Sequence, residues 1–589
     1  MNAESPSNAP IESPTADESV TMSIDQAMTL AHSHHAAGRL QHAERVYRNI
    51  LQAVPGHPFA LYHLGLMALQ IGRYDYAALR FQAVLKKAPS NVAALVGMSN
   101  ALSHLGDLAG AERFVRQALQ IDSSNAAAHS SLGRIQLDRA MHSLATASHA
   151  RAVELEPNDP WHLTGLLYCM AQDEASDPQQ LARMHRQFGK RFGAGLRANA
   201  TPHTNPRDPA KRLRIGFVSG DLREHAVAYF VEPVCREFDR GLVELFAYSN
   251  NQREDATSVR LRALVDHWRP VIGLSDVQLA EQVRDDGIDI LIDLSGHTVG
   301  NRLLAFARKP APVQASWIGY PETTGLTAMD YYLADPHNAP PGAIDVLYTE
   351  KLVRLPASAA FQPDANAPEV SPLPALQRGY VTFGSFNRSS KVGAKVILTW
   401  SRVLQQVPGS RLLMTPVSEG EQAQDLRQRF AEHGIAADRL SFAPRQALAK
   451  YLRLHHEVDV MLDTFPYTGG TTTRHALWMG VPVVTLAGLR RSERISTANL
   501  ARIGLADWST NSVDDYVARA VATAGDLAGL AVLREGMRER IAASPLCGAD
   551  TVARSIEIAF RAMWRRWCKG LPPEAFSVSL EQALQGDAA

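Results

Sequence analysis

The chain has 589 residues, of which 46% are hydrophobic and 20% charged, a composition typical of soluble globular proteins. Lysine plus arginine and aspartate plus glutamate both number 60, so no overall charge attracts nucleic acid or an anionic membrane, and we expect neither as a partner. A chain of this length exceeds a single hydrophobic core and predicts three or four folded units.

The N-terminal segment, residues 1–22, is rich in Ser, Pro, Asn and Ala and is predicted to be disordered. It lacks the charged and apolar regions of a signal peptide, and no run of about 18 apolar residues follows, so we expect a cytoplasmic protein without a membrane span. The four cysteines are scattered without a CxxC pair, which argues against a zinc site or a disulfide scaffold.

A period of 34 residues runs through the first quarter of the chain. Small residues mark it at Gly38, Gly72, Gly106 and Ala140, and again at Ala43, Ala77, Ala111 and Ala145. The period, with apolar residues at helical spacing between these markers, resembles tetratricopeptide repeats. We expect four helix pairs within residues 23–160, at about 25–58, 59–92, 93–126 and 127–160. The fourth is less regular, because His149 stands where the earlier repeats have Tyr47, Phe81 and Val115.

Stacked helix pairs of this kind form a superhelix with a concave groove that can hold an extended polypeptide. The alternative is that the array serves as a spacer or pairs two chains into a homodimer. A helical connector and linker is expected over 161–211, since prolines and polar residues mark a boundary near 197–211.

From residue 213 the pattern changes to that of alternating strands and helices. Strands are predicted at 213–218 and 288–294, and a second series of strands and helices begins at Gly379. This pattern predicts two Rossmann-like lobes, 212–370 and 371–548, with a ligand cleft between them. His225 and His297 follow two first-lobe strands and therefore lie at the carboxyl edge of the sheet, where ligands bind; a structural role is the alternative for each.

The segment 458–480 combines an apolar strand, a turn of glycines and threonines, and the start of a helix. Gly469 and Gly470 allow close approach of the backbone to a ligand, while Thr471 and Thr472 lie where a helix N-terminus offers unsatisfied N–H groups to an anion. A diphosphate fits such a turn, although an ordinary capped helix is the alternative interpretation.

Four motifs, in order along the chain, resemble those of the O-linked N-acetylglucosamine transferase and SPINDLY family. They are GDLREHAVAYF (220–230), a long motif beginning DLSGHTVGN (293–325), FGSFNRSSK (383–391) and LDTFPYTGGTTTRHALWMG (within 462–486). The resemblance implies glycosyltransferase family 41. The expected fold is α plus α/β, with a tetratricopeptide superhelix followed by a GT-B fold of two Rossmann-like domains. It also implies a C-terminal helix, 549–570, packing back on the first lobe, and a tail, 571–589.

The family activity implied is transfer of N-acetylglucosamine from UDP-GlcNAc to Ser or Thr hydroxyls of proteins, with inversion and without a metal or other cofactor. The nucleotide sugar and a polypeptide held by the repeats are then the partners. Two alternatives stay open, namely protein O-fucosylation from GDP-fucose, as in SPINDLY-type members, and a silent scaffold that binds peptides through its repeats.

The resemblance also assigns residues. Lys391 corresponds to the lysine that contacts the diphosphate, and His225 to a histidine beside the sugar and acceptor that is a candidate general base. Arg388 is placed at the nucleoside, Tyr451 at the base, and His475 where many members have a carboxylate for the ribose. The remaining residues implied for nucleotide-sugar binding are His297, Gln314, Tyr320, Pro321, Asn387, Gly469, Gly470, Thr471 and Thr472, and no metal ligands are implied.

Overall fold

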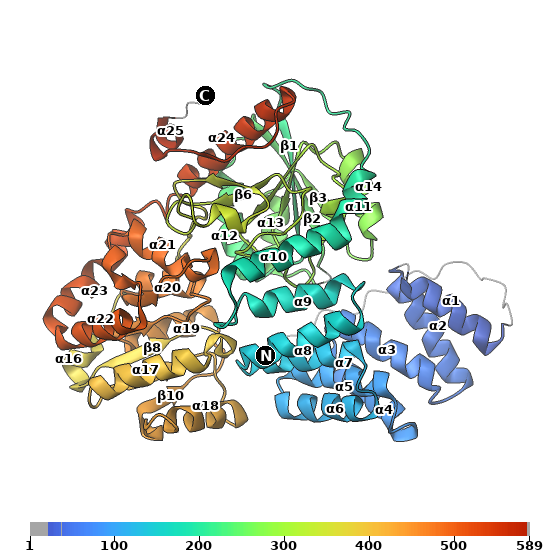
Figure 1. The fold of residues 1–589 in the computed structure, drawn as a ribbon, viewed down its shortest axis with the longest axis horizontal. Helices are drawn as coiled ribbons and strands as arrows, with labels where there is room; N and C mark the ends of the chain where they lie inside the picture. Colours follow the sequence, from blue (N-terminus) through green and yellow to red (C-terminus); the bar gives the residue numbers. More distant parts are fainter. Residues whose placement is uncertain (1–21, 37, 252, 586–589) are drawn as a thin grey trace, which may run out of the picture. The chain divides into compact units, whose positions relative to one another are not determined.

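The computed structural model describes residues 22–36, 38–251 and 253–585. Contacts between residues divide the chain into two compact units, 1–89 and 90–589, and each is described by itself. The segment predicted to be disordered, 1–22, lies outside the described residues except for Met22. Figure 1 shows the elements in chain order, from the blue repeat helices to the red C-terminal helices.

The first unit consists of two helix pairs, α1 (Ile24–Ala36) with α2 (Leu40–Ala53) and α3 (Pro58–Gln70) with α4 (Tyr74–Lys87). The second unit begins with two further pairs, α5 (Val92–Leu105) with α6 (Leu108–Ile121) and α7 (Ala126–Asp138) with α8 (His142–Leu155). Three pairs turn at a glycine with positive φ, whereas the fourth turns at Ala140 with φ of 57°. The missing glycine therefore costs the fourth turn some backbone strain.

The connector predicted over 161–211 is largely helical up to Ala198. A fifth helix pair, α9 (Pro160–Met170) and α10 (Pro178–Phe188), follows the repeats and leads through a π-helical turn to α11 (Ala194–Ala198). α9 packs against α8, so the stack of helices continues beyond the four repeats.

The first lobe is built on an eight-stranded sheet in which all strand pairs are parallel. Such a sheet is covered on both faces, which explains the nearly continuous apolar strands. In sheet order the strands are β14 (Phe576–Ser577), β7 (Lys351–Arg354), β6 (Tyr331–Ala334), β5 (Val313–Trp317), β4 (Ile290–Asp293), β1 (Leu213–Ser219), β2 (Val243–Ser249) and β3 (His267–Pro270). Its helices are α12 (Ala226–Glu237), α13 (Ala256–Ala263), α14 (Asp276–Asp285) and α15 (Leu303–Ala307).

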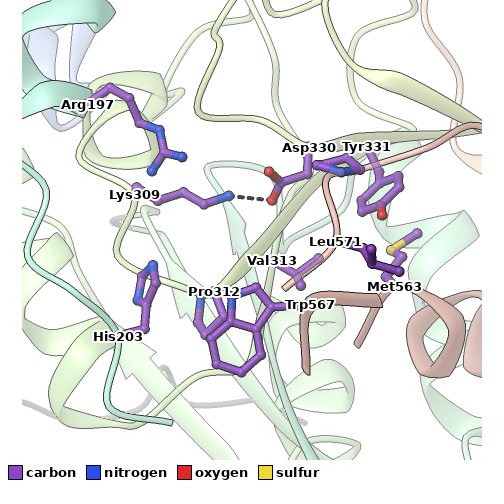
Figure 2. A pocket seen from close by; sticks show the side chains of 11 residues that line it. Arg197, His203, Lys309, Pro312, Val313, Asp330, Tyr331, Met563, Trp567 and Leu571 are labelled. Carbon is purple, nitrogen blue, oxygen red and sulfur yellow. Dashed lines mark hydrogen bonds and ion pairs between the residues drawn. The ribbon is translucent and has the colours of Figure 1, made fainter. Parts of the chain in front are cut away.

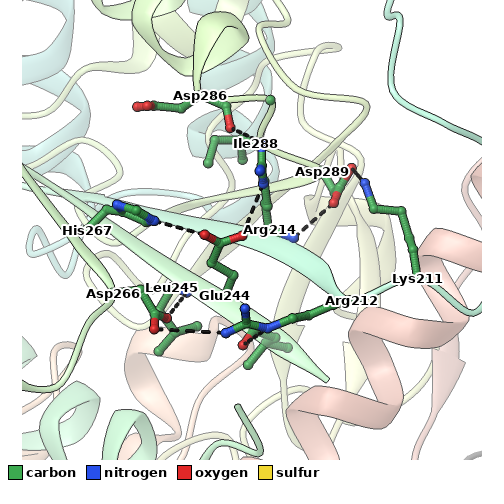
Figure 3. Close-up of polar contacts among 12 residues, drawn as sticks. Lys211, Arg212, Arg214, Glu244, Leu245, Asp266, His267, Asp286, Ile288 and Asp289 are labelled. Carbon is green, nitrogen blue, oxygen red and sulfur yellow. Dashed lines mark hydrogen bonds and ion pairs between the residues drawn. The ribbon is translucent and has the colours of Figure 1, made fainter. Parts of the chain in front are cut away.

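Polar side chains fix the register at the amino edge of this sheet, as Figure 3 shows. The buried carboxylate of Asp289 accepts hydrogen bonds from Lys211 Nζ and from the main-chain N–H of Arg214, both at 2.9 Å. Arg214 Nε donates to Glu244 on the neighbouring strand at 3.1 Å, and His267 Nε2 lies 2.9 Å from the same carboxylate. A slip of one residue would break these pairs and turn the apolar residues to the wrong face.

The second lobe has a six-stranded parallel sheet. In sheet order its strands are β10 (Leu440–Phe442), β9 (Arg411–Met414), β8 (Thr382–Ser385), β11 (Val460–Leu462), β12 (Val483–Leu486) and β13 (Ser509–Thr510). Its helices are α16 (Pro374–Arg378), α17 (Ala394–Gln406), α18 (Glu421–Ala431), α19 (Leu448–Leu454), α20 (Thr471–Trp478), α21 (Ile495–Arg502), α22 (Val513–Gly525) and α23 (Leu527–Ala542).

The C-terminal segment returns to the first lobe. Helix α24 (Ala549–Cys568) buries Ile556, Phe560 and Trp564 in the core of that lobe, against strands β1, β4 and β5 and helix α12. Strand β14 then adds to the edge strand β7, and α25 (Leu580–Gln585) follows. The first lobe is therefore discontinuous in sequence and is completed by residues that follow the second lobe.

The prediction of helical repeats followed by two Rossmann-like sheets is confirmed. In the described ranges, no single helix combines the length and apolar character needed to cross a membrane. The helices α22 and α23 have the required length and apolar character only when they are taken together. The chain bends by 94° at the break between them.

We expect Trp564→Ala to lower the free energy of unfolding by about 3–5 kcal/mol, because a fully buried indole leaves a large cavity. The substitution also removes the hydrogen bond from Nε1 to the Asp208 carbonyl at 2.8 Å. Trp161, which is 55% exposed, provides the control, and Trp161→Ala should change stability by less than about 0.5 kcal/mol. Urea unfolding of the two variants tests this, and equal midpoints would contradict the role given to α24.

Candidate active site

Each sheet has a switch point at which the strand order reverses, between β1 and β4 in the first lobe and between β8 and β11 in the second. In open parallel sheets, ligands bind beyond the carboxyl ends of the strands at this point. The turns that leave these four strands carry most of the predicted residues. They are His225 and His297 in the first lobe, and Asn387, Arg388 and the turn 469–472 in the second.

Asp463, directly after β11, holds the glycine-threonine turn in place. Its carboxylate is 2% exposed and accepts hydrogen bonds from the Gly469 N–H at 2.9 Å, from Asn387 Nδ2 at 3.1 Å and from the Thr485 hydroxyl at 2.8 Å. Burial raises the pKa of the Asp463 carboxyl, while the hydrogen bonds and the Lys391 ammonium favour the ionised form. One buried group thus joins the loops after β8 and β11 to strand β12.

The turn is too tight for a side chain at its first glycine. A Cβ at Gly469 would lie 2.4 Å from Thr473 Oγ1 and 2.8 Å from Thr472 Oγ1, distances that Cβ atoms do not adopt. Gly470 is the N-cap residue of α20, and a Cβ there would meet only Ile495, at an ordinary contact distance of 3.6 Å. The turn therefore excludes a side chain at 469 and would accommodate a Cβ at 470.

Helix α20 begins at Thr471 without a side-chain cap. Thr472 Oγ1 donates to Asn387 Oδ1 at 3.2 Å, so this hydroxyl ties the helix start to the loop after β8. Thr471 and Thr472 are both half-buried. The first N–H groups of the helix, with the positive end of its dipole, are thus available to an anion.

Lys391 reaches this turn. Its Nζ donates to the carbonyl of Thr468 at 3.0 Å and lies 4.5 Å from the centre of the Tyr467 ring. Burial lowers the pKa of the Lys391 ammonium to about 8, while Asp463 raises it and Arg388 lowers it. A cation held beside an uncapped helix start forms a suitable site for a diphosphate.

His225 is the N-cap residue of α12 and is half-buried. Its Nδ1 accepts a hydrogen bond from the Val227 N–H at 3.3 Å and lies 3.6 Å from Asp221 Oδ2. Burial lowers the pKa of His225; Asp221 opposes this, and the charges of Arg223 and Arg388 lower it further. The charge of the exposed Arg388 guanidinium thus lowers the pKa of both His225 in the first lobe and Lys391 in the second.

Four predicted residues lie in the interior of the first lobe. His297 is 1% exposed, its Nε2 lies 2.9 Å from the carbonyl oxygen of Thr324, and burial lowers its pKa to about 4. Gln314 donates to two carbonyls of its own lobe at 2.9 and 3.0 Å, and both Tyr320 and Pro321 are buried. These side chains support the turns after β4 and β5, and direct contact with a ligand stays a prediction.

Tyr451 and His475 lie together in the second lobe, with ring centres 5.5 Å apart. Tyr451 also packs on Phe386, and His475 on Phe361. Burial lowers the pKa of His475 to about 4, so the ring is neutral at pH 7. Among the described residues, the Tyr451 hydroxyl has no hydrogen-bond partner. Aromatic faces and a free hydroxyl suit a nucleoside base, and this role stays a prediction.

Sequence reasoning missed the buried loop after β12 that joins the lobes. Arg491 donates to the Tyr332 hydroxyl at 2.5 Å, and Ser492 Oγ donates to Glu322 at 2.6 Å, both across to the first lobe. The main chain of Ser492 also accepts a hydrogen bond from the Thr468 hydroxyl at 2.9 Å. The available signal was a cluster of arginines directly after an apolar strand, where charges need buried partners.

A cavity of about 200 Å³ lies elsewhere, at the amino ends of β5 and β6 (Figure 2). Lys309 pairs there with Asp330, and Trp567 of α24 forms one wall. Because this cavity lies at the edge of the sheet opposite the switch point, it is not the donor site that the strand order predicts.

The family model of glycosyl transferase family 41 matches residues 195–365 and 374–556, and tetratricopeptide repeat models match 28–79 and 68–135. A probable UDP-N-acetylglucosamine–peptide N-acetylglucosaminyltransferase SPINDLY of Hordeum vulgare is 38% identical over 68% of this chain. The corresponding SPINDLY protein of Arabidopsis thaliana is 37% identical over 67% of it. The chain spans only 43% and 44% of these two relatives.

Among solved structures, an O-GlcNAc transferase mutant from Thermobaculum terrenum matches 87% of this chain and 98% of its own. The TM-score is 0.82 and the sequence identity 36%. The match therefore covers more of the chain than the two lobes alone.

The pKa of Lys391 predicts how diphosphate binding depends on pH. The ammonium is protonated below about pH 8 and loses its charge above it, so UDP should bind about tenfold more weakly at pH 9 than at pH 7. His225, whose pKa lies below 6.5, does not titrate in this window. Calorimetric titration with UDP at pH 7 and pH 9 measures the change in affinity. Lys391→Ala should remove this dependence on pH. An equal affinity of the unmodified protein at both pH values would contradict the prediction.

Proposed function

Because the chain belongs to glycosyl transferase family 41, we propose that it transfers N-acetylglucosamine from UDP-GlcNAc to Ser or Thr hydroxyls of proteins, with inversion. The observation that carries the proposal is the meeting of Lys391 with the uncapped start of α20 at the switch point of the second sheet. The names of the relatives support the donor and acceptor classes.

The chemistry needs stabilisation of the leaving diphosphate, because negative charge grows on it as the glycosidic bond breaks. Lys391 supplies an ammonium, Arg388 a guanidinium, and the N–H groups of Thr471 and Thr472 the positive end of a helix. Asp463 and Asn387 hold the helix start in place and Lys391 donates to the Thr468 carbonyl, so little reorganisation of these groups is required. We therefore propose that transfer proceeds without a metal ion or other cofactor.

His225 is suited to donate a hydrogen bond. Its Nδ1 accepts from the Val227 N–H, so in the neutral ring the proton is on Nε2. That nitrogen has no hydrogen-bond partner among the described residues, and a protonated Nε2 cannot accept a proton from the acceptor hydroxyl. His225 in this arrangement orients the sugar or the acceptor, and deprotonation of the hydroxyl falls to another group.

The repeats are proposed to bind the polypeptide acceptor, in keeping with the extended surface that helix pairs provide. The reaction is proposed to take place in the cytoplasm. The four cysteines are free thiols, as expected in a reducing compartment.

Loss of the Lys391 charge should lower kcat/KM for transfer about 100- to 1000-fold, because an electrostatic contact to the leaving group is removed. Lys391→Ala is compared with Lys351→Ala, which alters an exposed lysine at the start of β7 and should have no effect. Binding of UDP, GDP, UDP-GlcNAc and GDP-fucose is measured on the same proteins. Selective binding of GDP-fucose would show that GDP-fucose is the donor in place of UDP-GlcNAc. Absence of nucleotide binding would favour a silent scaffold.

The two roles of His225 predict different variant series. His225→Ala should lower kcat/KM by about 100-fold, whereas His225→Asn, which keeps an N–H donor and can cap α12, should restore a large part of the rate. Rates are measured from pH 6 to 8. Equal losses in both variants, with disappearance of the acidic limb of the pH profile, would identify His225 as the general base instead.

A further inference from the structure

A cluster of three side chains in the turn between α8 and α9 is unrelated to the transfer site. The donor atoms of Glu156, Asp159 and His162 all lie within 4.8 Å of one another. His162 Nε2 is 3.3 Å from Glu156 Oε2 and 3.9 Å from Asp159 Oδ2. The two carboxylates are partly exposed and line an open hollow formed by residues 155–161, so an ion can reach them, while the imidazole is buried.

Two of the three ligands are oriented by groups outside the cluster. Asp159 uses Oδ1 to cap α9, accepting from the Trp161 N–H at 2.7 Å, and this leaves Oδ2 directed toward His162. His162 Nδ1 lies 2.9 Å from the hydroxyl of Ser130 on α7. Such partners of the second ring nitrogen orient metal-binding histidines in general.

The histidine is a departure from the 34-residue repeat. The positions that correspond to His162 in the second, third and fourth repeats are the buried alanines Ala60, Ala94 and Ala128. A second departure, His149, meets the same Ser130 hydroxyl at 3.3 Å, with its ring between Gly133 and Gly165. Two histidines thus stand where the preceding repeat has the apolar residues Val115 and Ala128, and both meet Ser130 beside the two carboxylates.

The hydroxyl of Ser130 has a single proton to share between two imidazoles. When it donates to His149, it accepts from the Nδ1–H of His162, and the lone pair of His162 Nε2 then faces Glu156 and Asp159. Two carboxylates and a lone pair around one point form a coordination site for a cation.

We propose that Glu156, Asp159 and His162 bind a divalent transition-metal ion of the zinc type, with water completing the coordination. Bonds of about 2.0–2.2 Å in tetrahedral geometry separate the ligand atoms by about 3.3–3.5 Å. His162 Nε2 lies 3.3 Å from Glu156 and 3.9 Å from Asp159, and all three atoms lie within 4.8 Å, so small movements of the two carboxylates complete the geometry. The spacing of cysteines could not reveal this site, because none of its ligands is a cysteine.

A metal at this turn would stabilise the first turn of α9, a helix that contacts both lobes. Thr164 Oγ1 lies 3.5 Å from His297 Nδ1 in the first lobe, and the carbonyl of Met170 accepts from Arg490 of the second lobe at 3.1 Å. The ion would therefore act at the junction between repeats and transferase lobes and take no part in transfer.

The test uses the full chain, freed of metal with a chelator and titrated with Zn²⁺ by calorimetry. Glu156→Gln and Asp159→Asn keep the hydrogen bonds and the helix cap but remove one ligand charge, and each should weaken binding about tenfold or more. His162→Ala should abolish this site. Asp122→Asn, 34 residues before Glu156 in the preceding repeat, is the matched control and should bind as the unmodified protein does.

Thermal unfolding gives a second readout, since an ion that binds only the folded chain raises the unfolding midpoint. Zn²⁺ should raise the midpoint of the unmodified protein and of Asp122→Asn more than that of Glu156→Gln. Equal titrations and equal midpoint shifts for the unmodified protein and all four variants would overturn the site. A larger shift with Mg²⁺ or Ca²⁺ than with Zn²⁺ would overturn the assignment of the metal class.

Discussion

A buried carboxylate after β11 holds together the segments on which the candidate site depends. Asp463 binds the N–H of the turn before α20, the Asn387 side chain after β8 and a hydroxyl of β12. Lys391 in turn donates to Thr468 within that turn, so the cation and the helix start take their positions from one anchor. A buried ion without such donors would be costly, and the hydrogen bonds to Asp463 offset this cost.

The first lobe also has a buried aspartate that holds a turn in place. Asp293, at the end of β4, accepts hydrogen bonds from the N–H groups of Ser295 and Gly296 and from the Ser316 hydroxyl. Both aspartates stand on the strand beside a switch point, and both order the turn that leaves it. The loop after β12 joins the two lobes, since Arg491 donates a hydrogen bond to Tyr332 of the first lobe.

Sequence periodicity predicts most of the fold, because the 34-residue repeat and the alternation of apolar strands with helices are both regular. The 34-residue spacing locates the helix pairs, and apolar runs locate strands such as β1 and β9. The functional roles of Lys391 and His225 came from motif resemblance, since a lone lysine or histidine carries no such signal. The interior positions of His297 and Gln314 could not be predicted, because a strand pattern does not say how deeply the following turn is covered.

The site residues that escaped prediction share a physical reason. Asp463, Ser492 and Arg491 act through contacts between segments distant in sequence, and no local pattern encodes such contacts. The same holds for His149 and His162, which both lie within hydrogen-bond distance of the Ser130 hydroxyl. These two departures from the repeat are 13 residues apart and become neighbours only after the helices pack. A departure from a regular repeat is nevertheless visible in the sequence, and it is the more informative signal when two occur together.

The return of α24 and β14 to the first lobe has a consequence for how the protein is made. During synthesis, residues 212–370 leave the ribosome before the helix that fills their core, and the whole second lobe must be translated in between. The second lobe, whose core is formed by residues 361–546, can fold in that interval. The N-terminal lobe therefore matures last, with its apolar surface awaiting the final segment of the nascent chain.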